Sequence, residues 1–184
     1  MIDEKTGIDF PFFQSQVVDI FGQPDENGPF AQNYLRTLDL TEYADALGHV
    51  LDYEGNPWGH KIYCNFVMHD PLKRAFGLIV SRGLADQLKT YDGSFNIRQS
   101  KGGGMMSMHS WGLAVDFNAS TNPFSADGEL ITDFSDDFIR CFAESGFESG
   151  RIWARPKDPM HQQIVWTKDW RGSDNPLAPV PWQA

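Results

Sequence analysis

One segment organises the rest of the chain: Ser107-Met108-His109-Ser110-Trp111-Gly112-Leu113-Ala114-Val115-Asp116-Phe117-Asn118. After the turn expected at Gly112, apolar residues alternate with small or polar ones, which predicts a β-strand. The apolar side chains at 113, 115 and 117 would share one face of this strand, and Asp116 would lie on the other. Burying a carboxylate beside core residues is costly unless it is paired or binds a metal. The segment therefore predicts a functional Asp116, to which His109 returns across the turn.

A third metal-binding side chain is expected from the C-terminal part of the chain, where Asp158-Pro159-Met160-His161 occurs. Catalytic zinc sites use three protein ligands and leave the fourth position for water. His109, Asp116 and His161 supply two imidazoles and one carboxylate, a suitable set. The sequence thus predicts Zn²⁺ as the cofactor, held by these three residues.

Hydrolysis at such a site needs further groups around the ion. Zinc lowers the pKa of a bound water towards about 7, and a carboxylate then takes the proton and passes it to the leaving amine. Asp158, three residues before His161, is the candidate base. Arg98, at the end of a predicted short strand, is the candidate for stabilising charge on the attacked carbonyl or for binding a substrate carboxylate. Ser107 is expected to hydrogen-bond within the site or to the substrate. We reject a serine-hydrolase interpretation, because no Gly-x-Ser-x-Gly turn is present.

Length and composition indicate a globular protein. The chain has 184 residues, of which 41% are hydrophobic and 14% aromatic, enough for one compact domain over residues 1–184. A net charge of −10 repels nucleic acid and anionic membranes. The sequence contains no uninterrupted apolar run of membrane length. We therefore expect a protein that binds no nucleic acid and does not insert into a membrane. We also expect it to be a monomer.

The ends of the chain and the remaining histidines and cysteines carry weaker expectations. The segment Met1-Ile2-Asp3-Glu4-Lys5 lacks the pattern of a signal peptide, which predicts synthesis in the cytoplasm. The proline-rich tail 174–184 is expected to be an extended strap or a loose end. Structural or surface roles are expected for His49, His60 and His69. Buried free thiols are expected for Cys64 and Cys141.

The order of expected elements indicates the fold class. Helices are predicted near 41–50, over 70–80 with Asp70 as N-cap and Pro71 in the first position, and after the N-cap Ser135 as far as Gly146. Strands are predicted over 61–67, 94–98, 113–118, 151–154 and 160–166. Helices first and strands broken by one helix afterwards predict an α+β protein with a small antiparallel β-sheet.

These motifs carry a family resemblance. The pattern Ser107-x-His109-x-x-Gly112-x-Ala114-x-Asp116 resembles the SxHxxGxAxD motif of the zinc D-Ala-D-Ala carboxypeptidase family, which includes vancomycin-resistance D,D-peptidases and phage L-alanyl-D-glutamate endopeptidases. The residues Asp158-Pro159-Met160-His161 are similar to its second motif. The phage branch is most similar, with Asp as base and a segment like Gly146-Phe147-Glu148-Ser149-Gly150-Arg151-Ile152-Trp153. The run from Tyr91 to Arg98 also resembles the segment that carries the family's arginine. The resemblance covers about residues 60–166.

The resemblance implies a small antiparallel sheet flanked by helices, with zinc in an open groove. It implies a zinc metallopeptidase that hydrolyses an amide bond in peptidoglycan stem peptides. The phage-like features favour an endolysin of the L-alanyl-D-glutamate endopeptidase type, which reaches the cell wall after release or as part of a phage particle. Two alternatives stay open: a D-alanyl-D-alanine carboxypeptidase or dipeptidase with the same site, and a non-catalytic wall-binding or virion module that keeps structural zinc.

Overall fold

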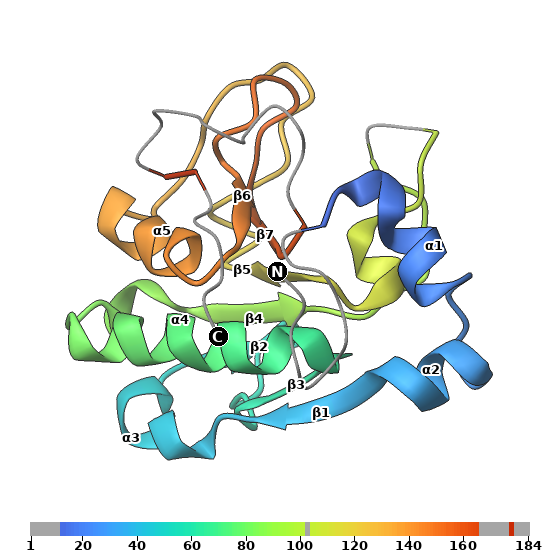
Figure 1. Ribbon diagram of the computed structural model, residues 1–184. Helices are drawn as coiled ribbons and strands as arrows, with labels where there is room; N and C mark the ends of the chain where they lie inside the picture. Colours follow the sequence, from blue (N-terminus) through green and yellow to red (C-terminus); the bar gives the residue numbers. More distant parts are fainter. Residues whose placement is uncertain (1–11, 102–103, 166–176, 179–184) are drawn as a thin grey trace.

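A computed structural model describes residues 12–101, 104–165 and 177–178 (Figure 1). The expectations for the N-terminal segment, for most of the proline-rich tail and for a strand reaching residue 166 lie outside the described residues.

The described part of the chain contains two longer helices and several short ones. The longer helices are α4 (His69–Ser81) and α5 (Asp136–Ala143). The shorter α-helices are α1 (Val17–Phe21), α2 (Pro29–Tyr34) and α3 (Ala44–Leu47). The 3₁₀ turns are η1 (Gln14–Gln16), η2 (Thr41–Tyr43), η3 (Phe66–Met68), η4 (Ala85–Gln87) and η5 (Met108–Trp111). None of these helices is both long enough and apolar enough to span a membrane.

The described strands form two sheets. The larger sheet has the order β2 (Leu51–Asp52), β4 (Thr90–Gly93), β5 (Ala114–Phe117), β7 (Asp158–Gln163) and β6 (Glu148–Gly150). Its strands pair antiparallel except β2 with β4, which are parallel. The smaller sheet pairs β1 (Leu35–Asp39) antiparallel with β3 (Lys61–Asn65). The predicted α+β class, a small, mainly antiparallel sheet with helices against it, is confirmed.

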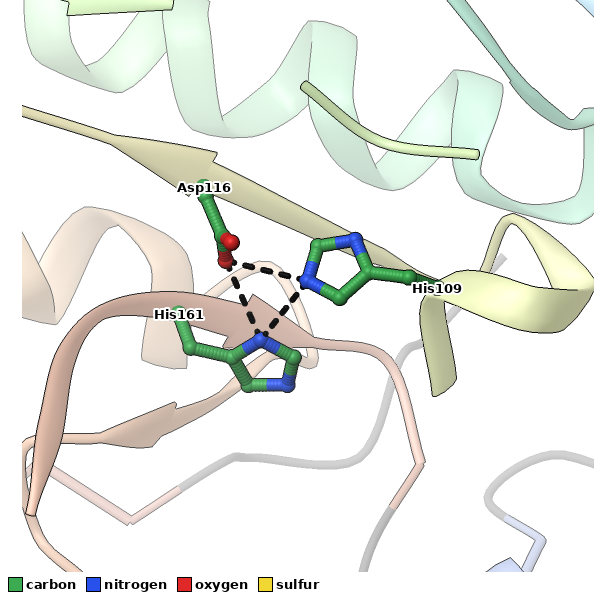
Figure 2. Close-up of side chains that lie close together, drawn as sticks. All are labelled: His109, Asp116 and His161. Carbon is green, nitrogen blue, oxygen red and sulfur yellow. Dashed lines mark hydrogen bonds and ion pairs between the residues drawn. The ribbon is translucent and has the colours of Figure 1, made fainter. Parts of the chain in front are cut away.

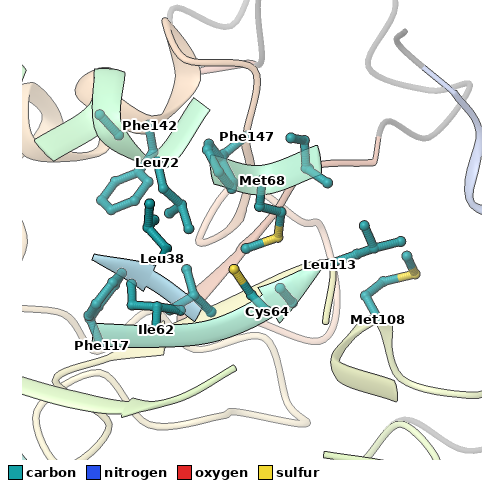
Figure 3. Close-up of a cluster of buried hydrophobic side chains, with 14 of the residues drawn as sticks. Leu38, Ile62, Cys64, Met68, Leu72, Met108, Leu113, Phe117, Phe142 and Phe147 are labelled. Carbon is teal, nitrogen blue, oxygen red and sulfur yellow. The ribbon is translucent and has the colours of Figure 1, made fainter. Parts of the chain in front are cut away.

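The alternation along β5 separates the core from the site. Its apolar residues Val115 and Phe117 are fully buried, as is Leu113 just before the strand. The ring of Phe117 contacts Phe76 of α4 and Phe142 of α5, with centroids 5.9 and 5.8 Å apart. Figure 3 shows this core drawing side chains from both sheets and from α4 and α5. Each such fully buried side chain contributes about 1.5–3 kcal/mol of apolar transfer free energy. One face of β5 is therefore held in the core, and the other face can carry the polar side chains of the site.

Gly112 closes the turn between η5 and β5, as the sequence predicts. Its φ is +61°, in the left-handed region, and a Cβ at this position would lie 2.7 Å from the backbone nitrogen of Asn65. Both the conformation and the close approach require glycine. The turn directs His109 back towards the strand that carries Asp116.

Several predicted boundaries are wrong. The strand from Lys61 ends at Asn65, because the Asn65 side chain accepts a hydrogen bond from the Val67 nitrogen and starts η3. Helix α4 then continues directly from η3 with Met68 at its N-cap, so Asp70 is not the cap. The helix expected near 41–50 is shorter, comprising η2 and α3.

Two predicted strands are displaced by a few residues. Residues 94–98 are not a strand; pairing stops at Gly93, whose φ is +119° and where the register with β5 shifts. The strand expected at 151–154 is β6, three residues earlier in the chain. By contrast, the N-cap at Ser135 is confirmed, since its hydroxyl accepts from the Phe138 nitrogen at 3.2 Å. Free, buried thiols at Cys64 and Cys141 are also confirmed.

Candidate metal centre

Three side chains from separate elements converge at one point beside β5 (Figure 2). His109 comes from η5, Asp116 from β5 and His161 from β7, where Asp116 and His161 are register partners. The Nε2 of His109, the Nδ1 of His161 and the Oδ1 of Asp116 form a triangle whose three sides are each 3.1 Å. Antiparallel pairing and the Gly112 turn thus bring together residues up to 52 positions apart.

This triangle has the dimensions of a metal site. A tetrahedral zinc ion with ligands at its usual distances places pairs of ligand atoms about 3.3 Å apart. The 3.1 Å sides are close to that value. Among the residues that the structure describes, this is the only group of three or more His, Cys, Asp or Glu side chains close enough to share an ion. The group could hold a divalent metal and leave a fourth position for water.

The protonation of the two imidazoles also suits a metal. The Nδ1 of His109 donates to the Ser94 carbonyl at 2.5 Å, and the Nε2 of His161 donates to Oε1 of Gln163 at 3.0 Å. In a neutral imidazole the other nitrogen then carries a lone pair. Two lone pairs and a carboxylate oxygen therefore face one another, which is unfavourable without a positive charge between them.

The pKa values of two side chains in the centre are shifted from their ordinary values. Burial alone raises the pKa of Asp116, but the adjacent imidazoles of His109 and His161 outweigh it, and the pKa lies well below its ordinary value. Burial alone lowers the pKa of His161, yet the hydrogen bond and charge of Asp116 raise it overall. Metal ligands must be deprotonated, so metal binding at this centre competes with protons.

Asp158 lies at the start of β7, next to the triangle. Among the described residues its Oδ1 is buried and has no hydrogen-bond partner. Burial raises the pKa of Asp158, and the opposing charge of His161 reduces this shift. Gly150 of β6 pairs with Asp158, and a Cβ there would overlap the Asp158 carbonyl oxygen. The close packing of β6 therefore fixes the position of this carboxylate.

Arg98 and Ser107 line the same cavity as Asp158. The backbone of Arg98 is held against η5, because its nitrogen donates to Oγ of Ser110 at 3.0 Å and its carbonyl accepts from the Ser107 nitrogen at 2.9 Å. Ser107 is the N-cap of η5 and its hydroxyl accepts from the His109 nitrogen. Both residues line the cavity that also contains Asp158 and His161. Their catalytic and substrate-binding roles stay predictions.

The residues of the triangle border two cavities. The first, of about 510 Å³, is bordered by Asp158, His161 and Trp153. The second, also of about 510 Å³, is bordered by His109, Asp116 and three tyrosines. Arg98 lines both cavities.

The sequence analysis missed the partners that orient the two imidazoles. The Ser94 carbonyl and Gln163 bind the outward ring nitrogens, and Glu148 contacts Gln163 at 3.3 Å. Gln163 follows His161 by two residues on a strand, so it lies on the same face, and this spacing could have identified it. The three histidines expected to be structural lie away from the centre, and each contacts a backbone carbonyl: His49 that of Leu88, His60 that of Leu47 and His69 that of Arg36.

Comparison with known proteins agrees with this geometry. No curated protein and no solved structure gives a significant match to the chain. Residues 100–164 match the model of a family described as D-alanyl-D-alanine carboxypeptidase. This segment contains the whole triangle and Asp158, and its match supports a relationship to that family of zinc peptidases.

Proposed function

We propose that the protein is a zinc metallopeptidase that hydrolyses an amide bond in the peptide stems of peptidoglycan. The observation that carries the proposal is the triangle of three electron-pair donors with a buried, unpartnered carboxylate oxygen beside it. The match of residues 100–164 to a peptidase family supports the same reaction class.

In this proposal His109, Asp116 and His161 hold Zn²⁺. The ion, when bound, supplies Lewis acidity and an activated water at neutral pH. Asp158 accepts a proton at Oδ1 and later donates it to the leaving amine. Its raised pKa suits both steps, because the carboxyl group gains and loses a proton more easily near neutral pH. Arg98 binds the developing negative charge or a substrate carboxylate.

The cleft favours an endopeptidase over a carboxypeptidase. Triangle residues border both cavities, which leaves room for a substrate to extend beyond the cleaved bond in two directions. The first cavity is lined by three cations, Arg98, Lys101 and Arg155, and by the carboxylates of Glu148 and Asp158. An acidic residue such as D-glutamate in this cavity complements the three cations. This supports an L-alanyl-D-glutamate endopeptidase, and we propose one of the phage endolysin type that acts on the wall after release or within a phage particle.

Mass spectrometry of fragments released from purified peptidoglycan tests the proposal. We expect zinc-dependent release of peptides with a new N-terminal D-glutamate, and no release by Asp158→Ala. Loss of terminal D-alanine alone would instead identify the carboxypeptidase. Zinc binding without any product would identify a non-catalytic wall-binding or virion module.

A further inference from the structure

A chain of hydrogen bonds extends from His161 away from the metal triangle. The Nε2 of His161 donates to Oε1 of Gln163 at 3.0 Å. The Nε2 of Gln163 donates to Oε1 of Glu148 at 3.3 Å, and the indole nitrogen of Trp153 donates to the same carboxylate oxygen. The Trp153 ring lies against the His161 ring, with centroids 5.5 Å apart. These four residues form a closed loop around one metal-binding imidazole.

The central pair of this hydrogen-bond chain, Gln163 and Glu148, lies on two neighbouring strands of the larger sheet. Gln163 of β7 and Glu148 of β6 are register partners, so their side chains meet across the two strands. Glu148 is 0% exposed and Gln163 is 3% exposed. Little solvent reaches either group, and each hydrogen bond is therefore strongly directional and costly to leave unmade.

The carboxylate determines which groups of the hydrogen-bond chain donate and which accept. The indole N–H of Trp153 can only donate, so Oε1 of Glu148 is an acceptor, and Gln163 turns its NH₂ group towards that oxygen and its carbonyl oxygen towards His161. A carbonyl oxygen accepts only from a protonated ring nitrogen, which fixes the proton of His161 on Nε2. The lone pair is then on Nδ1, the atom that faces Asp116 and His109.

We propose that Glu148, acting through Gln163, is a positioning residue that selects the metal-binding tautomer of His161. This inference rests on the metal centre of the proposed function and adds two residues to it. Glu148 reaches the Nε2 of His161 through the Gln163 amide, so replacing its carboxylate by an apolar group removes the direction of the hydrogen-bond chain. Without that acceptor the Gln163 amide can present either end to His161.

Glu148→Leu tests the proposal, because it removes the acceptor of both donors with little change in volume. We expect Zn²⁺ affinity, measured by competition with a chromophoric chelator, to fall about 10- to 100-fold, as for other groups that orient a ligand. In the metal-free protein, at a pH at which the ring is neutral, long-range ¹H–¹⁵N correlations should show His161 protonated on Nε2 in the wild type and a mixture of tautomers in the variant. This second readout requires neither metal nor activity.

Gln163→Leu provides a second variant and Gln162→Leu a matched control. Gln163→Leu removes the acceptor and should weaken Zn²⁺ binding by a similar factor. Combining it with Glu148→Leu should weaken binding little further, because Glu148 acts on the Nε2 of His161 through Gln163. Gln162 is a neighbouring buried amide whose NH₂ group donates to the Pro159 carbonyl instead, so Gln162→Leu should keep the wild-type affinity.

Three results would overturn the proposal. These are an unchanged affinity and tautomer in folded Glu148→Leu, additive losses in the double variant, or a loss in Gln162→Leu as large as in Gln163→Leu. Failure of the proposed function has a different signature, because the wild-type protein would then bind no Zn²⁺ or release no peptide fragments.

Discussion

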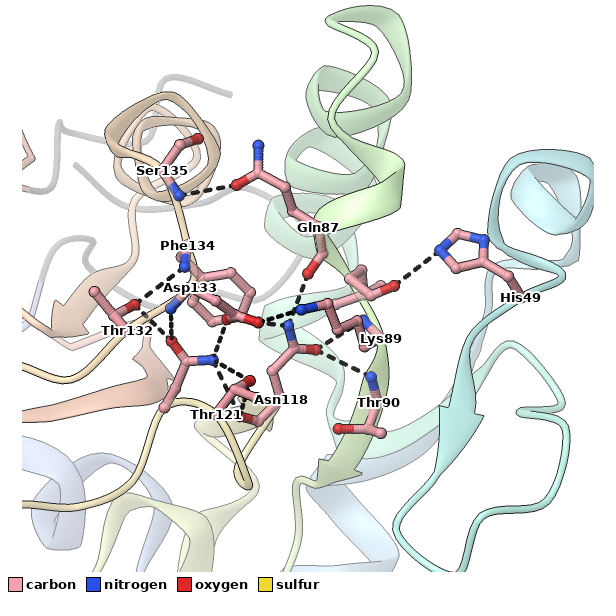
Figure 4. Close-up of polar contacts among 12 residues, drawn as sticks. His49, Gln87, Lys89, Thr90, Asn118, Thr121, Thr132, Asp133, Phe134 and Ser135 are labelled. Atoms are coloured by element: carbon pink, nitrogen blue, oxygen red, sulfur yellow. Dashed lines mark hydrogen bonds and ion pairs between the residues drawn. The ribbon is translucent and has the colours of Figure 1, made fainter.

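Asp116 and Asn118 lie two residues apart on the same face of one strand segment, and each belongs to a polar cluster. The two clusters differ in how completely their hydrogen-bond donors and acceptors are paired. Asn118, directly after β5, is fully paired within the protein (Figure 4). Its Oδ1 accepts from the backbone nitrogens of Lys89 and Thr90, at 2.7 and 3.0 Å, and its Nδ2 donates to the Gln87 carbonyl at 2.7 Å. Every donor in this group of contacts meets an acceptor.

The cluster continues into the segment before α5 with the same balance. Asn122 donates to Oδ1 of Asp133 at 2.6 Å and accepts from the hydroxyl of Thr132 at 2.5 Å. Its backbone nitrogen donates to the Asn118 carbonyl at 2.9 Å. Such a network ties the segment that precedes α5 to the end of β5 and needs nothing from outside the chain.

The cluster around Asp116 lacks this balance. Its three facing atoms are all acceptors once the outward ring nitrogens have donated to Ser94 and Gln163. A polar cluster that closes on itself holds the fold, whereas one that presents only acceptors is complete only with a cation. The balance of donors and acceptors, more than burial, therefore separates the structural cluster from the functional one.

Asp116→Asn should remove the difference in hydrogen-bond pairing between the two clusters, and it should have the largest effect on metal binding and hydrolysis. The amide adds a donor to the triangle and removes the charge, so the cluster satisfies itself as Asn118 does. We expect Zn²⁺ affinity to fall by more than the roughly 100-fold expected for loss of an orienting partner, and hydrolysis to stop. Metal content measured after dialysis, together with fragment release, checks this. His161→Ala should behave in the same way; a variant that retains stoichiometric zinc would contradict the assignment of ligands.

Asp158→Ala should separate chemistry from metal binding. Removing a general base lowers the rate by about 10²- to 10⁴-fold, while the three ligands are untouched. We expect normal zinc content with hydrolysis reduced by at least that factor. Equal activity of the variant and the wild type in the fragment assay would exclude Asp158 as the base.

Asn118→Asp is the reverse exchange in the structural cluster. The carboxylate cannot donate to the Gln87 carbonyl, so two acceptors face each other at that position. Leaving a buried group unsatisfied costs about 1–3 kcal/mol, which urea denaturation of the metal-free protein should show as a lower midpoint. Zinc stoichiometry of the folded variant should be unchanged. If stability were unaffected, the network would not contribute to the fold as argued.

The smallest expected effect is a displacement of the pH profile. Burial raises the pKa of Asp158, and only the ionised form accepts a proton. Activity should therefore be absent below this pKa and rise as the pH passes through it, at a pH above the ordinary aspartate value of about 3.9. Values of kcat/KM, taken with zinc content at each pH, measure this limb. An acidic limb at or below the ordinary value, with zinc still bound, would argue against Asp158.

The sequence predicts the parts of this molecule that depend on local spacing. The alternation from Leu113 to Phe117 and the turn at Gly112 follow from neighbouring residues, and both are present in the structure. The pairing of Glu148 with Gln163 does not follow from spacing, because it depends on the register between β6 and β7. The strand predicted at 94–98 is absent for a related reason, because the register shift at Gly93 arises only when β4 pairs with β5.

The direct pairing of Asp116 with His161 gives the metal centre a role in assembly. Sliding β7 by a single position along β5 would turn the imidazole to the opposite surface of the sheet. An ion held by these residues would bind tightly only to chains whose strands have aligned correctly, and mass action would then favour that alignment over every slipped alternative. The proposed ion would in this way also stabilise the correct strand register.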